Sequence, residues 1–323
     1  MREPLPSSSA WSTDPAVTPT FWENPVTVRV PATSANLGPG FDSLGLALSL
    51  NDEVTASATS GGVRVLVEGE GADAVPRDES HLIITTMHRT FAAMEATAPG
   101  IDLRCINRIP HARGLGSSSA AIVAGAMLAR GLLVDGDLRL TDDDLLALVV
   151  EIEGHPDNVA PCLLGGLVIA WTDDADGHPR AVSLPVLPVV EPIVLVPAVE
   201  VSTALARSLL PATVTHHDAA VNSGRAALLI DAMTREPANL LAATRDLLHQ
   251  DARQTAMPDS HALMLELRAA GVAAAISGAG PSVMALVASD AEREAFAAVV
   301  ANQAELVVHP MTVDSVGAML IAG

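Results

Sequence analysis

Residues 110–121, PHARGLGSSSAA, have a composition suited to binding an anion. Two glycines and three consecutive serines lead into an apolar stretch over residues 120–133, which predicts a helix directly after a loop. The first N–H groups of a helix lack a partner within the helix and lie at the positive end of its dipole. Glycine lets the backbone approach an anion closely, and serine hydroxyls can cap the helix, bind phosphate oxygens or ligate Mg²⁺. The segment therefore predicts a phosphate site.

This loop differs from two common nucleotide-binding motifs. A Walker A motif requires a lysine, and all 18 Lys and Arg residues of the chain are arginine. The glycine spacing also differs from GxGxxG. Considered alone, the segment leaves open the less favoured alternative of a glycine turn before a well-capped helix, without any ligand.

Three further segments carry glycine or polar residues in unusual density. They are PATSANLGPGFDSLGLAL from Pro31, EGHPDNVAPCLLGG from Glu153 and SGAGPSVMAL from Ser277. Together with residues 110–121, which we call the serine loop, and in their order along the chain, they closely resemble the motifs of the GHMP kinase superfamily. The resemblance covers nearly the whole chain. PATSANLGPGFD and HPDNVAP resemble the versions in the branch that phosphorylates L-homoserine. The resemblance implies transfer of the γ-phosphoryl group of ATP to the side-chain hydroxyl of L-homoserine, a step of threonine biosynthesis.

The resemblance also implies an α+β fold of two domains. An N-terminal, ATP-binding domain like the second domain of ribosomal protein S5 would span residues 25–180. A ferredoxin-like α/β domain would span residues 181–323, with ATP and the acceptor alcohol between the two. Residues 1–24 are rich in Pro, Ser and Thr and lack the apolar core of a secretory signal peptide, so we expect a disordered tail there.

By resemblance, the serine loop surrounds the ATP phosphates, mainly through backbone N–H groups. Its residues are Pro110, His111, Ala112, Arg113, Gly114, Leu115, Gly116, Ser117, Ser118, Ser119 and Ala120. Ser118 matches the family serine that approaches Mg²⁺, and a glutamate before HPDN completes the metal site. Glu151 and Glu153 both fit that position, and we prefer Glu153; the alternative is that both are solvated acids at a helix end. Mg²⁺ needs few carboxylates when waters and phosphate oxygens fill its other positions.

The acceptor is expected between the first segment and HPDN. Asn36 and Asp42 would face its ammonium and hydroxyl groups, while His155 and Asn158 would border the reacting hydroxyl as the catalytic residues. Some GHMP kinases have an aspartate base where Asn158 stands. An amide is a poor base near neutral pH, so we predict no dedicated side-chain base. The third segment would fix the shape of the serine loop, with Ser277 and Ser282 hydrogen-bonding nearby; its core is Ser277, Gly278, Ala279 and Gly280.

Two arginines match the family arginines that bind the substrate carboxylate. They are Arg207 in STALARSLLP and Arg253 in LLHQDARQTAMP, and Thr203 would line the same pocket. Arginine offers a planar pair of donors to a carboxylate. One departure is His81-Leu82 at the start of the helix near adenine, where the family often has Asn-Leu. The adenine contact is therefore open, although histidine can stack or donate.

The composition limits the kinds of partner and the compartment that we expect for this protein. A net charge of -20 argues against nucleic acid and against an anionic membrane surface. The most apolar run, residues 181–201, is interrupted by prolines and Glu191, so no bilayer span is predicted. Cys105 and Cys162 form no disulfide framework, which fits a reducing cytoplasm. The family suggests a homodimer.

Two other functions compete with the homoserine assignment. One is a GHMP kinase acting on mevalonate, a sugar or a phosphorylated isoprenoid precursor, against which Arg207, Arg253 and the first segment argue. The other is a catalytically silent relative that binds ATP or an amino acid as a regulator. The complete serines, glutamates and HPDN argue against that one.

Hydrophobic periodicity predicts the elements that must position these residues. In the first half we expect strands at 26–30, 44–50, 63–67, 101–109 and 167–171, helices at 80–94, 120–133 and 141–153, and turns over 31–42 and 172–180. In the second half we expect helices at 203–209, 218–233, 237–251, 261–270 and 290–304, strands at 193–197, 306–309 and 317–321, and a hairpin over 273–288.

Overall fold

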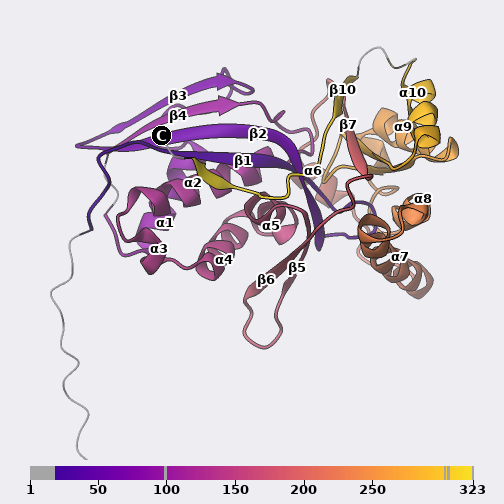
Figure 1. Ribbon diagram of the computed structural model, residues 1–323, viewed down its shortest axis with the longest axis horizontal. Coiled ribbons are helices and arrows are strands. Elements are labelled where there is room, and N and C mark those ends of the chain that lie inside the picture. Colours follow the sequence, from indigo (N-terminus) through magenta and orange to yellow (C-terminus); the bar gives the residue numbers. More distant parts are fainter. Residues whose placement is uncertain (1–18, 98–99, 302, 304–305, 322–323) are drawn as a thin grey trace, which may run out of the picture.

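A computed structural model describes residues 19–97, 100–301, 303 and 306–321. Two sheets, each covered by helices, lie side by side along the long axis of the molecule (Figure 1). None of the described helices is both long and apolar enough to cross a membrane. The predicted tail, residues 1–24, falls mostly outside the described residues. Within its described part, the ring of Phe21 packs edge-on against Phe91, with 5.5 Å between centroids.

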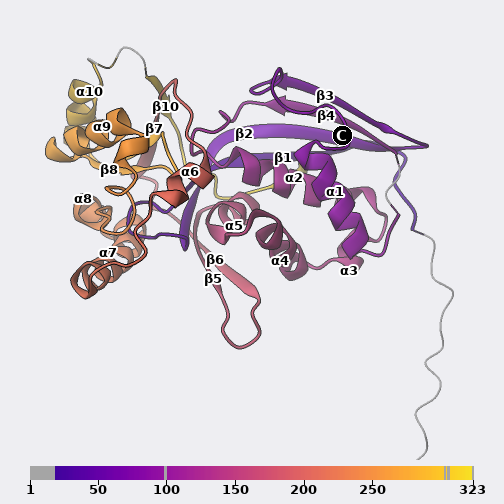
Figure 2. The same cartoon turned by 180° about the vertical axis from the view of Figure 1, so that it is seen from behind.

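The first sheet, within the described part of the chain, has seven strands in the order β11-β1-β2-β4-β3, with β5 joining β2 to β6. Its strands are β1 Val26–Ala35, β2 Leu44–Thr59, β3 Val63–Gly69, β4 Gly100–Asn107, β5 Leu167–Thr172, β6 Pro179–Leu184 and β11 Met319–Ile321. Its helices are α1 Leu82–Ala93, α2 Ser117–Leu132, α3 Gly136–Arg139, α4 Asp142–Glu153 and α5 Pro156–Leu164. These helices lie together on one side of the sheet (Figure 2).

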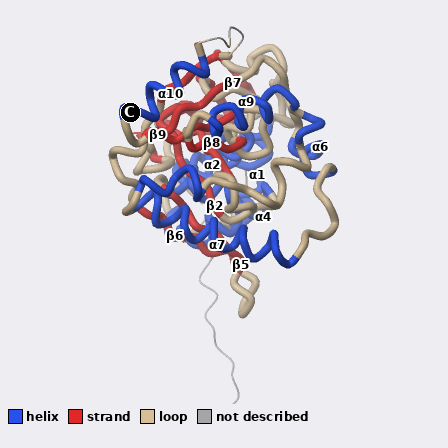
Figure 3. Tube along the Cα trace, turned by 90° about the vertical axis from the view of Figure 1, so that its right-hand side faces the viewer, coloured by secondary structure: helices blue, strands red, loops and turns tan. Residues whose placement is uncertain are grey.

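The second sheet has the order β10-β7-β9-β8. Its strands are β7 Glu191–Val196, β8 Ala273–Ile276, β9 Val283–Val287 and β10 Val307–Pro310. Its helices are α6 Thr203–Ser208, α7 His216–Thr234, α8 Leu240–Ala243, α9 Pro258–Ala269 and α10 Asp290–Val300, with 3-10 turns at Pro237–Asn239 and Gln254–Ala256. Seen from this end of the molecule, α9 and α10 lie against β7, β8 and β9 (Figure 3).

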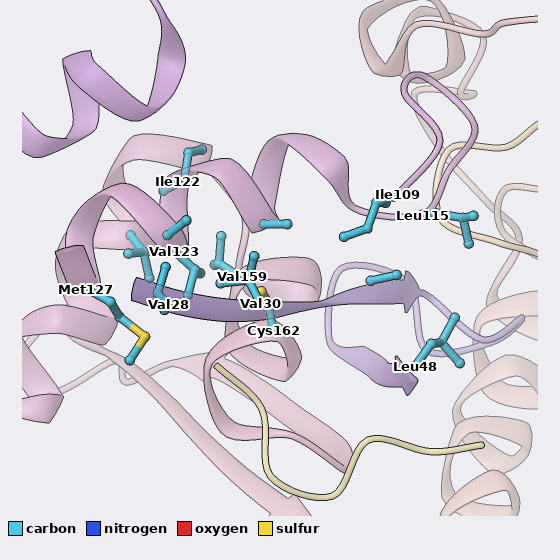
Figure 4. Packing of buried hydrophobic residues seen from close by; sticks show 14 of the residues in the cluster. Val28, Val30, Leu48, Ile109, Leu115, Ile122, Val123, Met127, Val159 and Cys162 are labelled. Carbon is cyan, nitrogen blue, oxygen red and sulfur yellow. The ribbon is translucent and has the colours of Figure 1, made fainter. Parts of the chain in front are cut away.

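The core of the first half lies between β1 and the helices α2 and α5. Val28 and Val30 of β1 pack with Ile122 and Val123 of α2 and with Val159 of α5 (Figure 4). Each such fully buried aliphatic side chain stabilises the fold by roughly 1.5–3 kcal/mol. The packing fixes α2, and therefore its serine-bearing N-terminus, relative to the sheet.

Most of the predicted elements are confirmed, and three differences affect the site. The predicted turn over 31–42 is shorter, because β1 continues to Ala35 after an irregularity at Pro31 and pairs with β2 as far as Gly45. A continuous helix over 237–251 is wrong. Asp246 accepts the N–H groups of Leu248, His249 and Gln250, which a longer helix would need for its own ladder.

The third difference is that the chain crosses back between the sheets. β6 pairs with β5 across the turn predicted over 172–180, which the structure confirms between the two strands, and β11 pairs with β1. The last described strand therefore belongs to the first sheet, although residues 181–323 were assigned to the second domain. The local pattern of residues 317–321 does not indicate which of the two sheets this strand joins, because an edge strand of either sheet can pair with a short apolar strand.

Candidate active site

The serine loop places its two glycines where no other residue fits. Gly114 and Gly116 have φ of 73° and 69°, the left-handed region. A Cβ on Gly114 would overlap the carbonyl oxygen of Ser277, and one on Gly116 would overlap the Thr33 hydroxyl. Gly116 is also the N-cap of α2, so the first turn of that helix begins with Ser117. The chain thus turns sharply to present the N-terminal amides of α2, as the sequence predicted.

The third segment packs on this loop from the other half of the molecule. Ser277 Oγ donates to the Gly114 carbonyl over 2.6 Å, and the Gly278 N–H donates to Ala35 O over 3.1 Å. Ser282 behaves differently from the expectation: its hydroxyl is buried without a partner among the described residues. Its contact with the loop runs through the backbone instead, from its N–H to Arg113 O over 3.3 Å.

A cavity of about 260 Å³ opens between the two halves beside the loop. Most of the predicted site residues line it: Asn36, Asp42, Ala112, Gly114, Gly116, Ser117, Ser118, Ser119, Glu153, His155, Asn158, Thr203, Arg207, Arg253, Gly278, Ala279 and Gly280. Val201, Ser202 and Asp157 line it as well. We refer to it as the acceptor cavity.

Three loop residues line no cavity at the site. Leu115 is buried in the core, and Pro110 and Arg113 line neither this cavity nor a second one on the other side of the α2 N-terminus. The Arg113 side chain points toward the second half, where it donates to Pro197 O and Ala198 O and pairs with Glu200. Arg113 therefore ties the loop to the second half, and its guanidinium is not directed at the cavity.

The two glutamates at the end of α4 lie on opposite sides of the helix. Glu153 lines the cavity, and its carboxylate accepts from Ser118 Oγ over 3.3 Å and from Ser119 Oγ over 2.8 Å. Glu151 instead pairs with Arg89 of α1 over 2.7 Å at an exposed position. Two residues correspond to about 200° around a helix, so only one of them can face the loop.

Ser118 and Glu153 offer hard oxygen donors of the kind that Mg²⁺ prefers. The described residues contain no group of three or more His, Cys, Asp or Glu side chains that could hold a metal. A metal ion at this pair would therefore take its other ligands from water and phosphate oxygens, which suits Mg²⁺ and does not suit a closed zinc site.

The HPDN segment starts α5 with Pro156 at its first position. His155 Nδ1 lies 2.8 Å from Asp157 Oδ1, and this hydrogen bond raises the pKa of His155 against the opposing effect of burial. Asn158 Oδ1 accepts from Thr33 Oγ1 over 2.8 Å, so the remaining amide group is a donor that cannot take up a proton. Sequence reasoning missed Thr33 and Asp157, although both lie inside the quoted segments.

The charged residues predicted for the acceptor contact each other. Arg207 donates both terminal nitrogens to the Asp42 carboxylate, over 2.7 and 3.1 Å. Arg253 is buried, which lowers its pKa, and donates to Gly278 O over 3.2 Å. Asn36 donates to the same carbonyl and accepts the Asp42 N–H, both over 3.0 Å. Asn36 thus holds Asp42 in place by its side chain.

A second cavity, of about 240 Å³, lies on the other side of the α2 N-terminus and shares Ser117 and Ser118 with the first. We refer to it as the base cavity. Its apolar walls are formed by Val30, Val54, Val75, Pro76, Leu82, Ile83, Ala120 and Ala121, and its polar walls by Asp52, His81, Asn107 and His111. A planar apolar ligand with a few polar edge atoms suits such a cavity.

His81 caps α1 and faces this cavity. Its Nδ1 accepts the Ile83 N–H over 3.3 Å, so in the neutral ring the proton is on Nε2. Burial lowers the pKa of His81 and of His111, which keeps both rings neutral near pH 7. The unusual His81 therefore acts as the helix cap that an asparagine would otherwise supply.

Asp52 lies behind the serine loop and was missed from the sequence. Its Oδ1 accepts the N–H groups of Arg108 and Ile109, over 2.5 and 2.9 Å, just before the loop begins. Burial raises its pKa to about 6 despite these bonds. The available signal was an acidic residue directly after an alternating apolar strand.

Comparison with known proteins identifies relatives over nearly the whole chain. Residues 81–166 match the N-terminal domain of GHMP kinases and residues 219–306 match the C-terminal domain. The chain is 52% identical to homoserine kinase of Streptomyces coelicolor over 272 residues, which cover 84% of this chain and 87% of that protein. It is 53% identical to homoserine kinase of Clavibacter michiganensis over 279 residues, covering 86% and 87%.

A solved structure agrees with this. The crystal structure of homoserine kinase from Cytophaga hutchinsonii superimposes with a TM-score of 0.78 at 26% identity, covering 98% of this chain and 100% of that chain. The two-domain α+β fold expected from the sequence is confirmed.

Proposed function

Since this chain belongs to the GHMP kinases, and to the homoserine kinases among them, we propose that it transfers the γ-phosphoryl group of ATP to the side-chain hydroxyl of L-homoserine. The products are ADP and O-phospho-L-homoserine. The reaction forms a bond between the substrate oxygen and the γ-phosphorus, and breaks the bond from that phosphorus to the β–γ bridging oxygen.

The observation that carries this function is the meeting of two unlike cavities at Ser117 and Ser118. The base cavity has apolar walls that suit adenine, and the acceptor cavity has charged groups of both signs that suit an amino acid. The N-terminus of α2 lies at their junction, where backbone N–H groups can bind the phosphates. ATP and the acceptor would then approach each other across Ser118.

Catalysis in this arrangement consists mainly of positioning and charge stabilisation, because phosphoryl transfer has a loose transition state. Mg²⁺, held by Ser118 and Glu153, would neutralise phosphate charge. Asn158 donates its amide N–H to orient the substrate hydroxyl, while Thr33 holds that amide in place. His155, with its pKa raised by Asp157, supplies a further donor at the same wall. With no side-chain base at Asn158, the hydroxyl loses its proton late, to phosphate oxygen or solvent.

The first test measures Mg²⁺-dependent ADP release with L-homoserine, mevalonate, galactose and no acceptor, with the product identified by ³¹P NMR. We expect turnover with L-homoserine only. Turnover only with mevalonate or galactose would discard the substrate assignment, and binding of ATP without any turnover would indicate a regulator.

A second test addresses Asn158. Asn158→Ala should lower kcat about 100-fold because the hydroxyl is no longer oriented, while KM for ATP stays within about threefold. An unchanged kcat would show that Asn158 has no such role.

The same proposal includes a cytoplasmic homodimer in threonine biosynthesis without nucleic-acid or membrane partners. Sedimentation of the purified chain, with and without ATP, tests the oligomeric state. A single monomeric species at all concentrations would contradict the dimer.

A further inference from the structure

Arg113 belongs to the serine loop, yet its guanidinium is bonded to the stretch of chain that leads into α6. Nε donates to Pro197 O over 3.0 Å, and Nη2 donates to Ala198 O over 2.6 Å. The side chain is 16% exposed. The main chain adds a parallel bond, because Ala112 O accepts the Val201 N–H over 3.3 Å. The loop is therefore bonded to one short stretch of the second half by both side chain and main chain.

That stretch carries part of the acceptor cavity. We call residues 197–208 the α6 segment, and two of its residues, Thr203 and Arg207, line that cavity. α6 lies at the boundary between the two halves (Figure 2). The structure describes the whole α6 segment, and only Val201 and Ala206 in it are buried. So sparsely buried a segment depends on its few hydrogen bonds for a fixed position, and those at its N-terminal end go to the serine loop.

An arginine in a phosphate-binding loop commonly contacts the anion itself, but Arg113 is poorly arranged for that role. Its N–H groups already donate to the carbonyl oxygens of His111, Pro197 and Ala198. The carboxylate of Glu200, 3.1 Å from Nη1, compensates its charge. Arg113 also lines neither cavity. Its influence on a bound nucleotide would therefore pass through the position of the loop, not through its charge.

We infer that Arg113 is a positioning residue that couples the binding of the ATP phosphates to the binding of the acceptor. This inference rests on the proposed function. Phosphate at the α2 N-terminus restricts the serine loop, and the loop restricts the α6 segment through Arg113. The α6 segment then presents Thr203 and Arg207 at a lower cost in conformational entropy, so the acceptor binds more tightly. By linkage, the acceptor tightens the nucleotide by the same factor, about 10-fold for a coupling of ordinary size.

The other bonds of the α6 segment do not reach the serine loop. Arg253 Nε donates to Ala206 O over 3.2 Å, and Arg207 binds Asp42. These bonds hold α6 to the wall of the acceptor cavity whether or not a nucleotide is bound. Among the described residues, the hydrogen bonds from the α6 segment to the serine loop run through Arg113 and the main chain next to it. The coupling therefore starts at the phosphates and does not involve the base cavity.

The test measures binding of AMP-PNP with Mg²⁺, an ATP analogue that does not transfer its γ-phosphoryl group, by calorimetry with and without saturating L-homoserine. The variants are Arg113→Gln and Arg113→Lys. Lysine keeps the charge, but its single nitrogen cannot replace the separate bonds of Nε and Nη2. The matched control is Arg139→Gln, because Arg139 is 22% exposed and also binds one carbonyl oxygen, of Met94, and one carboxylate, of Asp135. Adenosine, which lacks phosphates, is the second probe.

In the wild type and in Arg139→Gln, L-homoserine should tighten AMP-PNP about 10-fold and leave adenosine unaffected. In both Arg113 variants the factor for AMP-PNP should fall below about twofold, while Kd for AMP-PNP alone stays within about threefold. The unchanged Kd also checks the fold, and Arg113→Lys carries the test if Arg113→Gln does not fold.

Three results would overturn the inference. If Arg113→Gln weakens AMP-PNP alone about 10-fold or more and Arg113→Lys restores it, Arg113 contacts phosphate directly. Coupling that survives in both Arg113 variants arises from contact between the two ligands. Coupling that is absent from the wild type, or equally strong with adenosine, does not run through the serine loop. Failure of the wild type to turn over L-homoserine in the ADP-release assay would instead refute the proposed function, so the two failures are distinguishable.

Discussion

The two cavities on either side of the α2 N-terminus are built in different ways. The described walls of the base cavity all come from residues 30–121, which form strands and helices of the first half. The acceptor cavity takes its walls from residues as distant as Ala35 and Gly280, and its charged pair joins the two halves. One cavity is a pocket within a domain, and the other exists only when two halves are packed together.

The side chains that line the two cavities also differ in chemical character. The base cavity is largely apolar, and of its titrating groups Asp52 and His81 are buried and His111 is half-buried, so recognition there depends on shape and on a few fixed hydrogen bonds. The acceptor cavity contains carboxylates and guanidinium groups, of which Asp42 and Arg207 form an ion pair between the two halves. A change in how the halves pack should therefore disturb acceptor binding before it disturbs ATP binding.

The largest effect is expected at the junction of the two cavities. Glu153→Gln removes a carboxylate that we assign to Mg²⁺ and should lower kcat by about 100- to 1,000-fold, because charge stabilisation by a metal is worth several kcal/mol. Both KM values should change by about threefold or less. The Mg²⁺ concentration needed for half-maximal rate should rise. The matched control is Glu151→Gln, which removes only the exposed pair with Arg89; equal losses in the two variants would refute the assignment.

The second-largest effect is expected from a substitution that disturbs the packing of the two halves. Gly114→Ala places a Cβ against the Ser277 carbonyl at a φ of 73°, which pushes the third segment away. We expect kcat to fall about 100-fold and KM for L-homoserine to rise more than KM for ATP. The matched control is Gly177→Ala, because Gly177 has a similar φ of 72° and a Cβ there would meet no atom within 4 Å. It imposes the same backbone strain without a clash and should leave kcat and both KM values unchanged. If KM for ATP rose more than KM for L-homoserine, the two cavities would not differ as argued.

A smaller effect should be confined to the base cavity. His81→Leu removes both the cap of α1 and a polar edge of the cavity, so KM for ATP should rise about 10-fold and stability should fall by about 1 kcal/mol. His81→Asn should keep the cap and retain KM for ATP within about threefold. L-Homoserine should bind both variants as it binds the wild type. A parallel rise in its KM would mean that the cavities are coupled.

The smallest effect on activity is expected for Asp52→Asn, which changes the pH dependence of stability. Asp52 has its pKa raised to about 6, so the folded state holds this proton more tightly than the unfolded state does. Its ionisation therefore destabilises the wild type as pH rises through 6. Asparagine keeps the Oδ1 acceptor, so between pH 4.5 and 7.5 the wild type should lose roughly 2 kcal/mol relative to the variant.

Denaturant unfolding of both proteins at the two pH values measures that difference. If the difference in unfolding free energy between the two proteins is the same at both pH values, Asp52 is not a buried acid with a raised pKa. Asp52→Ala leaves two backbone N–H groups unpaired and should be destabilised at both pH values.

Local sequence patterns predicted most of the elements for physical reasons that act over a few residues. The helix predicted over 141–153 begins at a capping box between Thr141 and Asp144, and Gly116 turns the chain into α2 as its freedom of φ allows. The continuous helix predicted over 237–251 does not form, because side chains accept its backbone N–H groups. One of them is Asn222 of α7, whose Oδ1 accepts the Leu247 N–H. Contacts from a distant helix have no local signature.

The sequence by itself determined the four segments of the family, the serine loop among them, and the residue types of the site. Only the tertiary structure decided how they face one another. It turned Glu153 toward the serines and Glu151 toward Arg89, closed the acceptor cavity with segments from both halves, and paired Asp42 with Arg207. Backbone conformation depends largely on neighbouring residues, whereas the partner of a charge depends on which distant segment the packing of two cores brings beside it.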